Sequence, residues 1–382
     1  MNKNCKYFGV CGGCDYLTMD YNQQLLNKTE FIGDCLKKEN VNINVNNCVG
    51  MYFPFSYRNK VHLAIGENAK GNVLIGFFEE GSKKIINIDD CPLHDKWLKT
   101  LIEVLRKYIS DFKIKPYNNL NKTGTLRYVV ARCLDNNLII TLVCSNQNFA
   151  GKEVLYKNLK EHFKNVSLYL NINTRTDSAV FDEKFIHKFG DTKLMGKMLG
   201  VNFKLSPDSF FQVNFEIANK IYKQVINEIE EKPNCHILDL FSGIGITTML
   251  FSKVAKSVMS IECNHSAVKD AREMLKLNNV KNVTAICDRC ENRVEEIKEF
   301  LSVENSFVFV DPARNGIEKN VLQQLIDMNA KKIIYLSCNP ETLARDLKEL
   351  LKNNKYKINY VQPYDMFPHT KHVETLVVLE SN

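Results

Sequence analysis

The chain has 382 residues, 45% of them hydrophobic, which is enough for two cores because single domains usually hold roughly 100–200 residues. No segment approaches the roughly 18 consecutive apolar residues of a membrane helix. The N-terminal run MNKNCKYFGVCGGC also lacks the apolar stretch of a secretory signal. We therefore expect a cytoplasmic protein with no membrane partner. Its 13 cysteines are not expected to form disulfides, and their spacing must show which of them serve metal binding or catalysis.

The net charge of +7 is unevenly distributed along the chain. Up to Leu205 there are 29 Lys and Arg against 20 Asp and Glu, a balance of +9, and the remainder has 22 against 24, a balance of −2. A basic first half indicates a module that binds a polyanion such as a nucleic acid. Ordinary solvated lysines would give the same balance.

The first 205 residues mix short β-rich runs with amphipathic segments. NVLIGFF from Asn72 and NLIITLVC from Asn137 are typical of strands, and DKWLKTLIEVLRKYI from Asp95 is typical of a helix. This pattern predicts an α+β domain over residues 1–205.

From Ser206 onward, apolar strands alternate regularly with helical segments. Five short apolar runs are separated by helical periodicity, and two more strands follow at the end of the chain: HILDLF, SVMSIEC, VTAICD, SFVFVDP, KKIIYLSC, INYVQPYDMFP and HVETLVVLE. Such alternation predicts an α/β domain over residues 206–382, with a seven-stranded, doubly wound, Rossmann-like sheet of the methyltransferase type.

A glycine-containing turn, LDLFSGIG, follows the first of these strands. Gly243 and Gly245 allow a tight turn and close approach of a ligand, and Glu262 ends the next strand, where an acid can accept hydrogen bonds from ribose hydroxyls. The turn lacks the third glycine of a dinucleotide site. Its spacing suits adenosylmethionine at least as well as NAD.

Two further motifs leave the same predicted sheet edge. Asp311 opens DPARNG after the fourth strand, where an acid and an arginine can contact cofactor and base, although an Asp-Pro turn is also an ordinary strand exit. Cys338 follows the fifth strand, and Pro340 then begins a helix whose dipole should depress the pKa of the thiol. A small packed cysteine is the alternative, and the polar neighbours Ser337 and Asn339 argue against it.

Near the C-terminus, DMFPHTKHVE places Glu374 at the start of a strand. Considered alone, this segment is typical of a solvated hairpin loop.

The N-terminal cysteines have the spacing of a metal site. Cys5, Cys11 and Cys14, with two glycines between the last pair, suit an iron–sulfur cluster, and Cys91 in DDCPL is the best candidate for a fourth ligand. A zinc site built from the same four cysteines is the competing interpretation.

Together these motifs resemble the signature of the RNA uridine-5-methyltransferases. The resemblance lies in DPARNG, sixteen further residues and IIYLSCNPET, and in several motifs elsewhere, in the family's order: CKYFGVCGGC, YRNKVH, IGFFEEGSKKIINIDDCP, TLRYVVAR, DSFFQVN and DMFPHTKHVE. It covers nearly the whole chain.

The resemblance implies roles for individual residues. Cys338 matches the nucleophile and Glu374 the general base. Matches to S-adenosyl-L-methionine-binding positions are Gln212, Phe241, Gly243, Glu262, Asp311 and, in a loosely aligned stretch, Asp288. Cys5, Cys11, Cys14 and Cys91 match the ligands of a [4Fe–4S] cluster.

The cluster ligands occur in the branch that methylates 23S ribosomal RNA, so we expect that substrate and a monomeric enzyme, with transfer RNA as the alternative. Ala313 stands where the family usually has a second proline. Because Cys5 lies almost at the start, we expect no N-terminal β-barrel RNA-binding domain.

The implied chemistry needs a thiolate, because carbon 5 of uracil is too weak a nucleophile to attack a sulfonium methyl group unaided. Addition of Cys338 at carbon 6 would activate carbon 5, and Glu374 would later remove its proton. Arg314 is a candidate donor to the enolate oxygen. Plausible phosphate contacts are Arg58, Lys60, Arg127 and Arg132.

Two other functions compete with this one. RNA 5-methylcytosine enzymes resemble one another in having a cysteine in the fourth-strand motif, which here is DPAR. A non-catalytic iron–sulfur protein that binds RNA or senses redox state would have no need of the Cys338 and Glu374 pair.

Overall fold

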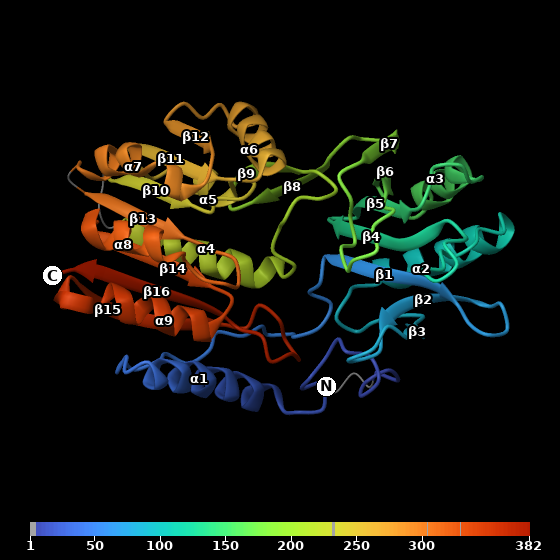
Figure 1. Ribbon diagram of the computed structural model, residues 1–382, viewed down its shortest axis with the longest axis horizontal. Coiled ribbons are helices and arrows are strands. Elements are labelled where there is room, and N and C mark those ends of the chain that lie inside the picture. The colour runs from blue at the N-terminus through green and yellow to red at the C-terminus, as the bar shows by residue number, and fades with distance from the viewer. Residues whose placement is uncertain (1–4, 231–233, 304, 329) are drawn as a thin grey trace. The chain divides into compact units, whose positions relative to one another are not determined.

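The computed structural model describes residues 5–230, 234–303, 305–328 and 330–382, and Figure 1 shows their arrangement into helices and strands. The chain forms two compact units. The first comprises residues 1–18, 54–196 and 204–208, and the second comprises 19–53, 197–203 and 209–382. Residues 19–53, which lie within the first predicted domain, thus belong to the second unit. No helix of the described ranges is long and apolar enough to cross a membrane.

The first unit is built on a seven-stranded sheet in the order β3-β2-β1-β4-β5-β6-β7. Its strands are β1 (Lys60–Glu67), β2 (Val73–Phe78), β3 (Ile85–Asn87), β4 (Leu126–Leu134), β5 (Asn137–Cys144), β6 (Asn165–Ile172) and β7 (Phe185–Gly190). Helices α2 (Trp97–Asp111) and α3 (Lys152–Lys160) pack their apolar faces on this sheet and close one core. The predicted strands from Asn72 and Asn137 and the predicted helix from Asp95 are confirmed.

The second unit contains the predicted seven-stranded sheet, in the order β12-β11-β10-β13-β14-β16-β15. Its strands are β10 (His236–Leu240), β11 (Ser257–Glu262), β12 (Val283–Cys287), β13 (Ser306–Val310), β14 (Lys332–Ser337), β15 (Tyr356–Tyr364) and β16 (Glu374–Ser381). The first five are parallel, and β16 runs antiparallel to β14 and β15. A separate two-stranded sheet pairs β8 (Leu194–Met198) with β9 (Val201–Leu205). The Rossmann-like methyltransferase architecture is therefore confirmed.

Helices cover both faces of this second sheet (Figure 1). They are α1 (Tyr21–Lys38), α4 (Phe215–Glu230), α5 (Ile246–Phe251), α6 (His265–Leu277), α7 (Val294–Leu301), α8 (Lys319–Met328) and α9 (Pro340–Leu350). Because side chains alternate along a strand, Leu238 and Leu240 join a core with α1, α7, α8 and α9. Phe309 points to the opposite face, where its ring lies 5.3 Å from that of Phe251 in α5.

The strand order creates a switch point between β10 and β13. These strands are neighbours, but the chain leaves β10 toward β11 on one side and returns to β13 on the other. Ligands of open α/β sheets bind beyond the carboxyl ends of strands at such a point. The turns after β10, β13 and β14 meet at this edge, as does the start of antiparallel β16.

Candidate active site and cysteine pocket

The turn after β10 is open on its ligand-facing side. Phe241, Gly243 and Gly245 all adopt left-handed backbone conformations, with φ of 61°, 54° and 79°. A Cβ added at Gly243 would meet no described atom within 4 Å, whereas one at Gly245 would lie 3.0 Å from the Cβ of Ala271. Gly243 thus leaves space for a ligand, and Gly245 allows α5 and α6 to pack closely.

Glu262 ties this turn to the end of β11. Its Oε2 accepts a hydrogen bond from the Gly243 amide at 2.9 Å, and its Oε1 accepts one from the Asn264 amide at 2.7 Å. The carboxylate therefore lies beside the open turn, where the sequence predicted a ribose contact.

Asp288 is held differently from the other predicted cofactor residues. Its carboxylate accepts hydrogen bonds from Arg293 Nε and Asn292 Nδ2, both at 2.8 Å, and its amide donates to Glu262 O at 3.1 Å. Its proximity to Glu262 agrees with a cofactor position, but its carboxylate is already engaged by its own loop.

Two acids with raised pKa values, buried Asp239 and half-buried Asp311, lie near the cofactor turn. Asp239 on β10 is fully buried and its Oδ2 accepts from the hydroxyls of Thr247 and Thr248 at 2.8 and 2.5 Å. Burial raises the pKa of Asp239 to about 7, against the two threonine hydrogen bonds. Burial, followed by the charge of Asp239, likewise raises the pKa of Asp311 to about 7.

Gln212 and Tyr222 are two further buried residues near these acids. Gln212 is buried and hydrogen-bonds the hydroxyl of buried Tyr222 on α4. Burial, followed by the charges of Asp311 and Glu374, raises the pKa of Tyr222. Sequence reasoning gave no role to Asp239, although it lies within LDLFSGIG, and it missed Tyr222, because a tyrosine within a helix carries no motif of its own.

Cys338 is half-buried between β14 and α9. Asn339 caps α9 by accepting from the Glu341 amide at 3.1 Å, and its Nδ2 donates to Arg314 O at 3.0 Å. Thr342 Oγ1 donates to the same carbonyl at 3.2 Å. The polar neighbour of Cys338 thus joins the DPARNG loop to the loop that carries the thiol.

The expectation that the helix dipole depresses the pKa of Cys338 is wrong for the protein without substrate. Burial, and next the charges of Glu374 and Asp311, raise this pKa to about 11. Arg314 lowers it, but is outweighed. Desolvation and two nearby carboxylates disfavour a thiolate more than the start of α9 favours it.

The register of the sheet carries Glu374 to Cys338. Ser337 pairs with Thr375 across β14 and β16, so the next residues outward, Cys338 and Glu374, are neighbours at the sheet edge. Glu374 is only 4% exposed. Burial, followed by the charge of Asp311, raises its pKa well above the ordinary value.

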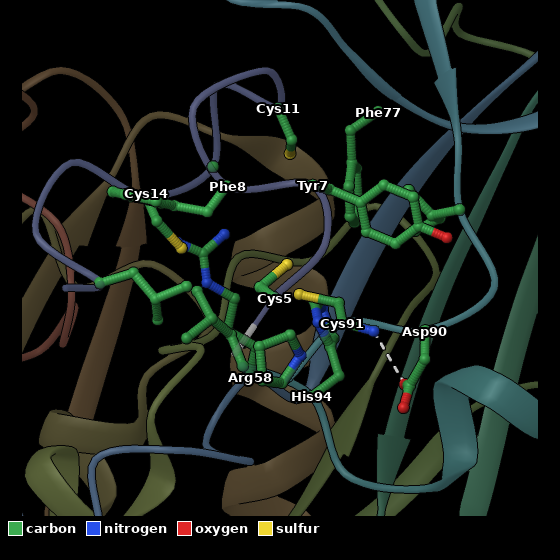
Figure 2. A pocket seen from close by; sticks show the side chains of 15 residues that line it. Cys5, Tyr7, Phe8, Cys11, Cys14, Arg58, Phe77, Asp90, Cys91 and His94 are labelled. Atoms are coloured by element: carbon green, nitrogen blue, oxygen red, sulfur yellow. Dashed lines mark hydrogen bonds between the residues drawn. The ribbon is translucent and has the colours of Figure 1, made fainter. Parts of the chain in front are cut away.

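The four candidate metal-binding cysteines line one cavity of about 70 Å³ in the first unit (Figure 2). Cys5, Cys11 and Cys14 come from the N-terminal segment and Cys91 from the turn after β3. The cavity wall is mainly apolar and includes Tyr7, Phe8, Phe77, Ile88 and Leu93.

Two of these cysteines accept backbone hydrogen bonds. Backbone hydrogen bonds from Gly13 and Leu93 lower the pKa values of Cys11 and Cys91, which burial raises overall. Across the residues that the structure describes, no three His, Cys, Asp or Glu side chains are close enough together to hold one metal ion.

The four basic residues predicted to contact phosphate have different surroundings. Arg58 lines the cysteine cavity, and buried Arg127 donates to the carbonyls of Asn173 and Arg175, both at 2.9 Å. Lys60 and Arg132 are paired across β1 and β4. Burial, and next the charge of Arg132, lower the pKa of Lys60 to about 8.

Comparisons with known proteins agree with this geometry. Residues 20–382 match the tRNA (Uracil-5-)-methyltransferase family. The chain is 33% identical to RNA methyltransferases of Clostridium tetani and Caldanaerobacter subterraneus, over 98% and 100% of its length and 82% and 84% of theirs. It also resembles the solved structure of Pyrococcus abyssi tRNA (uracil-54, C5)-methyltransferase in complex with S-adenosyl-L-homocysteine. The TM-score is 0.79 and the identity 29%, covering 97% of this chain and 84% of that one.

Proposed function

Because the chain belongs to the tRNA (uracil-5-)-methyltransferase family, we propose that it methylates carbon 5 of a uridine through a covalent adduct of Cys338. The chain is an S-adenosylmethionine-dependent RNA uracil-5-methyltransferase. The observation that carries the proposed adduct is the register that sets Glu374 beside Cys338, at the edge where the cofactor turn and Asp311 meet.

Cofactor binding is assigned to Gln212, Phe241, Gly243, Glu262 and Asp311, with Asp288 at the rim of the same site. Bound S-adenosylmethionine supplies an electrophilic methyl group and a positive sulfonium. Open space at Gly243 and the carboxylate of Glu262 support this assignment.

Cys338 acts as the nucleophile. Its thiolate forms a bond to carbon 6 of uracil, and the electron pair of the double bond between carbons 5 and 6 moves onto carbon 5 and oxygen 4 as an enolate. Carbon 5 would then take the methyl group as the methyl–sulfur bond breaks and S-adenosyl-L-homocysteine leaves. Arg314, whose charge lowers the pKa of Cys338, is proposed to stabilise both thiolate and enolate. The target base must leave its stack to reach this edge.

Glu374 acts as the base that completes the reaction. After methyl transfer, carbon 5 still bears its proton, and removal of that proton restores the double bond and expels the thiolate. The buried site that raises the pKa of Glu374 makes its carboxylate a stronger base.

Two substitutions test this assignment. Cys338→Ala should abolish formation of 5-methyluridine, and Glu374→Gln should slow turnover by about 10²–10⁴-fold while methylated RNA stays bound to protein. Cys235→Ala, a buried cysteine at the opposite end of β10, should retain activity. Methylation by the Cys338→Ala protein would refute the adduct.

We propose 23S ribosomal RNA as the substrate, on the resemblance of the four cysteines to cluster ligands. Transfer RNA is the second candidate, favoured by the description of the family and by the Pyrococcus structure. Mapping 5-methyluridine in both RNAs from a deletion strain distinguishes them, because the mark disappears only from the true substrate. Loss from transfer RNA alone would overturn the first proposal.

We also assign a [4Fe–4S] cluster to Cys5, Cys11, Cys14 and Cys91. The support is their shared cavity, its apolar wall and the amides of Gly13 and Leu93.

Of the four basic residues, Lys60 and Arg132 are proposed to contact RNA phosphate. Burial, and next the charge of Arg132, lower the pKa of Lys60 against the charge of Asp208, and a phosphate bound beside Lys60 would favour its charged form. Lys60→Met should lower the slope of log Kd for RNA against log salt by about one. Lys70→Met, at an exposed position, is the control. Equal slopes for both variants would contradict the proposal.

A further inference from the structure

Helix α1 places polar side chains inside the second unit at intervals of about one turn. Gln24 and Lys28 are 0% and 2% exposed, and Tyr21 precedes them on the same face. Farther along this face, Ile32 and Leu36 join the apolar core. Buried polar groups are costly unless they are hydrogen-bonded, so their partners identify what this part of the helix holds.

Lys28 and Tyr21 both hold Asp365. Lys28 Nζ lies 2.5 Å from Asp365 Oδ1 and also donates to Phe367 O at 3.2 Å, and Tyr21 OH donates to Asp365 Oδ2 at 2.7 Å. Asp365 is fully buried, and its amide donates to Val49 O at 2.9 Å. Both carboxylate oxygens are therefore fixed by α1.

Gln24 contacts His369, which lies four residues after Asp365 in the same segment. Its Oε1 accepts from the His369 amide at 3.0 Å, and its Nε2 lies 3.2 Å from His369 Nδ1. His369 has a φ of 66°, a conformation that a non-glycine residue adopts at a cost. Gln24 thus secures a strained point of the backbone, and only four residues separate His369 from Glu374.

From these contacts we infer that the Tyr21, Gln24 and Lys28 face of α1 positions Glu374 for removal of the proton from carbon 5. The inference rests on the proposed function. A buried ion pair is a poor source of stability compared with apolar packing, but it fixes geometry. Five of the directional contacts converge on residues 365–369, which lead into the base. Two others, from Gln24 Nε2 to Met19 O and from the Met51 amide to Tyr21 OH, fix the start of the helix and the segment after it. The apolar part of the same helix packs on the sheet.

The test compares neighbouring glutamines on α1. Gln24→Met keeps side-chain volume, leaves no buried charge and removes both contacts with His369 together with the hydrogen bond to Met19 O. Gln23→Met changes an exposed side chain whose contacts include Asn27. The substrate is RNA containing uridine tritiated at carbon 5, with the labelled methyl donor. The readouts are tritium release, methyl groups in a denaturation-resistant protein–RNA complex, and affinity for S-adenosyl-L-homocysteine.

We expect Gln24→Met to release tritium roughly 10–100-fold more slowly and to accumulate the methylated complex, as Glu374→Gln does, with unchanged affinity for the cofactor product. Tyr21→Phe, which removes one hydroxyl, should show the same pattern more weakly. The inference is overturned if Gln24→Met releases tritium as fast as Gln23→Met does. It is also overturned if Gln24→Met loses the methylated complex and the free product to the same extent. If Glu374→Gln itself fails to trap the complex, the proposed function fails instead.

Discussion

Cys338 lies among groups that act on its thiol in opposite directions. Burial and the charges of Glu374 and Asp311 raise its pKa to about 11, and the guanidinium of Arg314 lowers it. In the protein without substrate, the reactive thiolate is therefore a small fraction at neutral pH. The positive sulfonium of a bound cofactor would counter the carboxylates, so the nucleophile would be activated only in the loaded enzyme.

Alkylation of Cys338 by iodoacetamide should accordingly rise by about tenfold per pH unit between pH 7 and 9.5, without a plateau. Arg314→Met should slow alkylation roughly threefold at a given pH, since the exposed guanidinium is screened by solvent, and Arg314→Lys should not. The modified peptide can be quantified by mass spectrometry. A plateau near pH 8 would show instead that the start of α9 controls the thiol.

Asp239 makes the free energy of unfolding fall as pH rises, whereas an ion-paired acid makes it rise. Its pKa rises from 3.8 to about 7 on folding, so the folded state binds more protons between these values and stability falls as pH rises through them. Asp239→Asn should reduce this fall by on the order of 2 kcal/mol, as measured by urea denaturation at pH 5 and pH 8. Exposed Asp327→Asn is the control, and equal pH dependence in both proteins would contradict the prediction.

At the scale of elements, the two glycines of the cofactor turn have different roles. Gly243 leaves space for the cofactor, and Gly245 allows α5 and α6 to pack closely. Gly243→Ala and Gly245→Ala should each cost about 1–2 kcal/mol for the left-handed conformation. Gly245→Ala should cost more, because its Cβ would press on Ala271. Gly243→Ala should instead lose affinity for S-adenosyl-L-homocysteine in calorimetry. Gly33→Ala, within α1, should stabilise by about 0.5–1 kcal/mol.

The strands of the second unit could be predicted from sequence, because their apolar runs and the turns that end them are local patterns. The place of α1 could not. Its partner Asp365 is 337 residues from Lys28, and its face of Tyr21, Gln24 and Lys28 has no apolar periodicity to show that it is buried. The pKa of Cys338 was likewise mispredicted from its neighbours in sequence, since burial raises it most and two carboxylates that come from other strands raise it further.

For the whole molecule, the distribution of charge and of reactive groups follows the two units. The first holds the cysteine cavity and most of the excess positive charge, and the second holds the residues assigned to methyl transfer. Under the proposed function, the first unit would bind RNA and the cluster while the second carries out methyl transfer, so loss of the proposed cluster should weaken RNA binding while affinity for the cofactor is retained.

The proposed cluster can be tested by analysing the metal content of the whole protein. Protein purified without oxygen should be brown and contain about four irons per chain, because four thiolates in an apolar cavity with amides directed at sulfur favour a cluster. Cys91→Ala should lose iron and colour, whereas Cys133→Ala, a buried cysteine of the same unit, should keep both. A colourless protein with stoichiometric zinc would contradict the assignment. Iron retained by Cys91→Ala would place the fourth ligand elsewhere. In that case, a protein with all four of Cys5, Cys11, Cys14 and Cys91 changed to serine should lose the metal if the first three cysteines bind it.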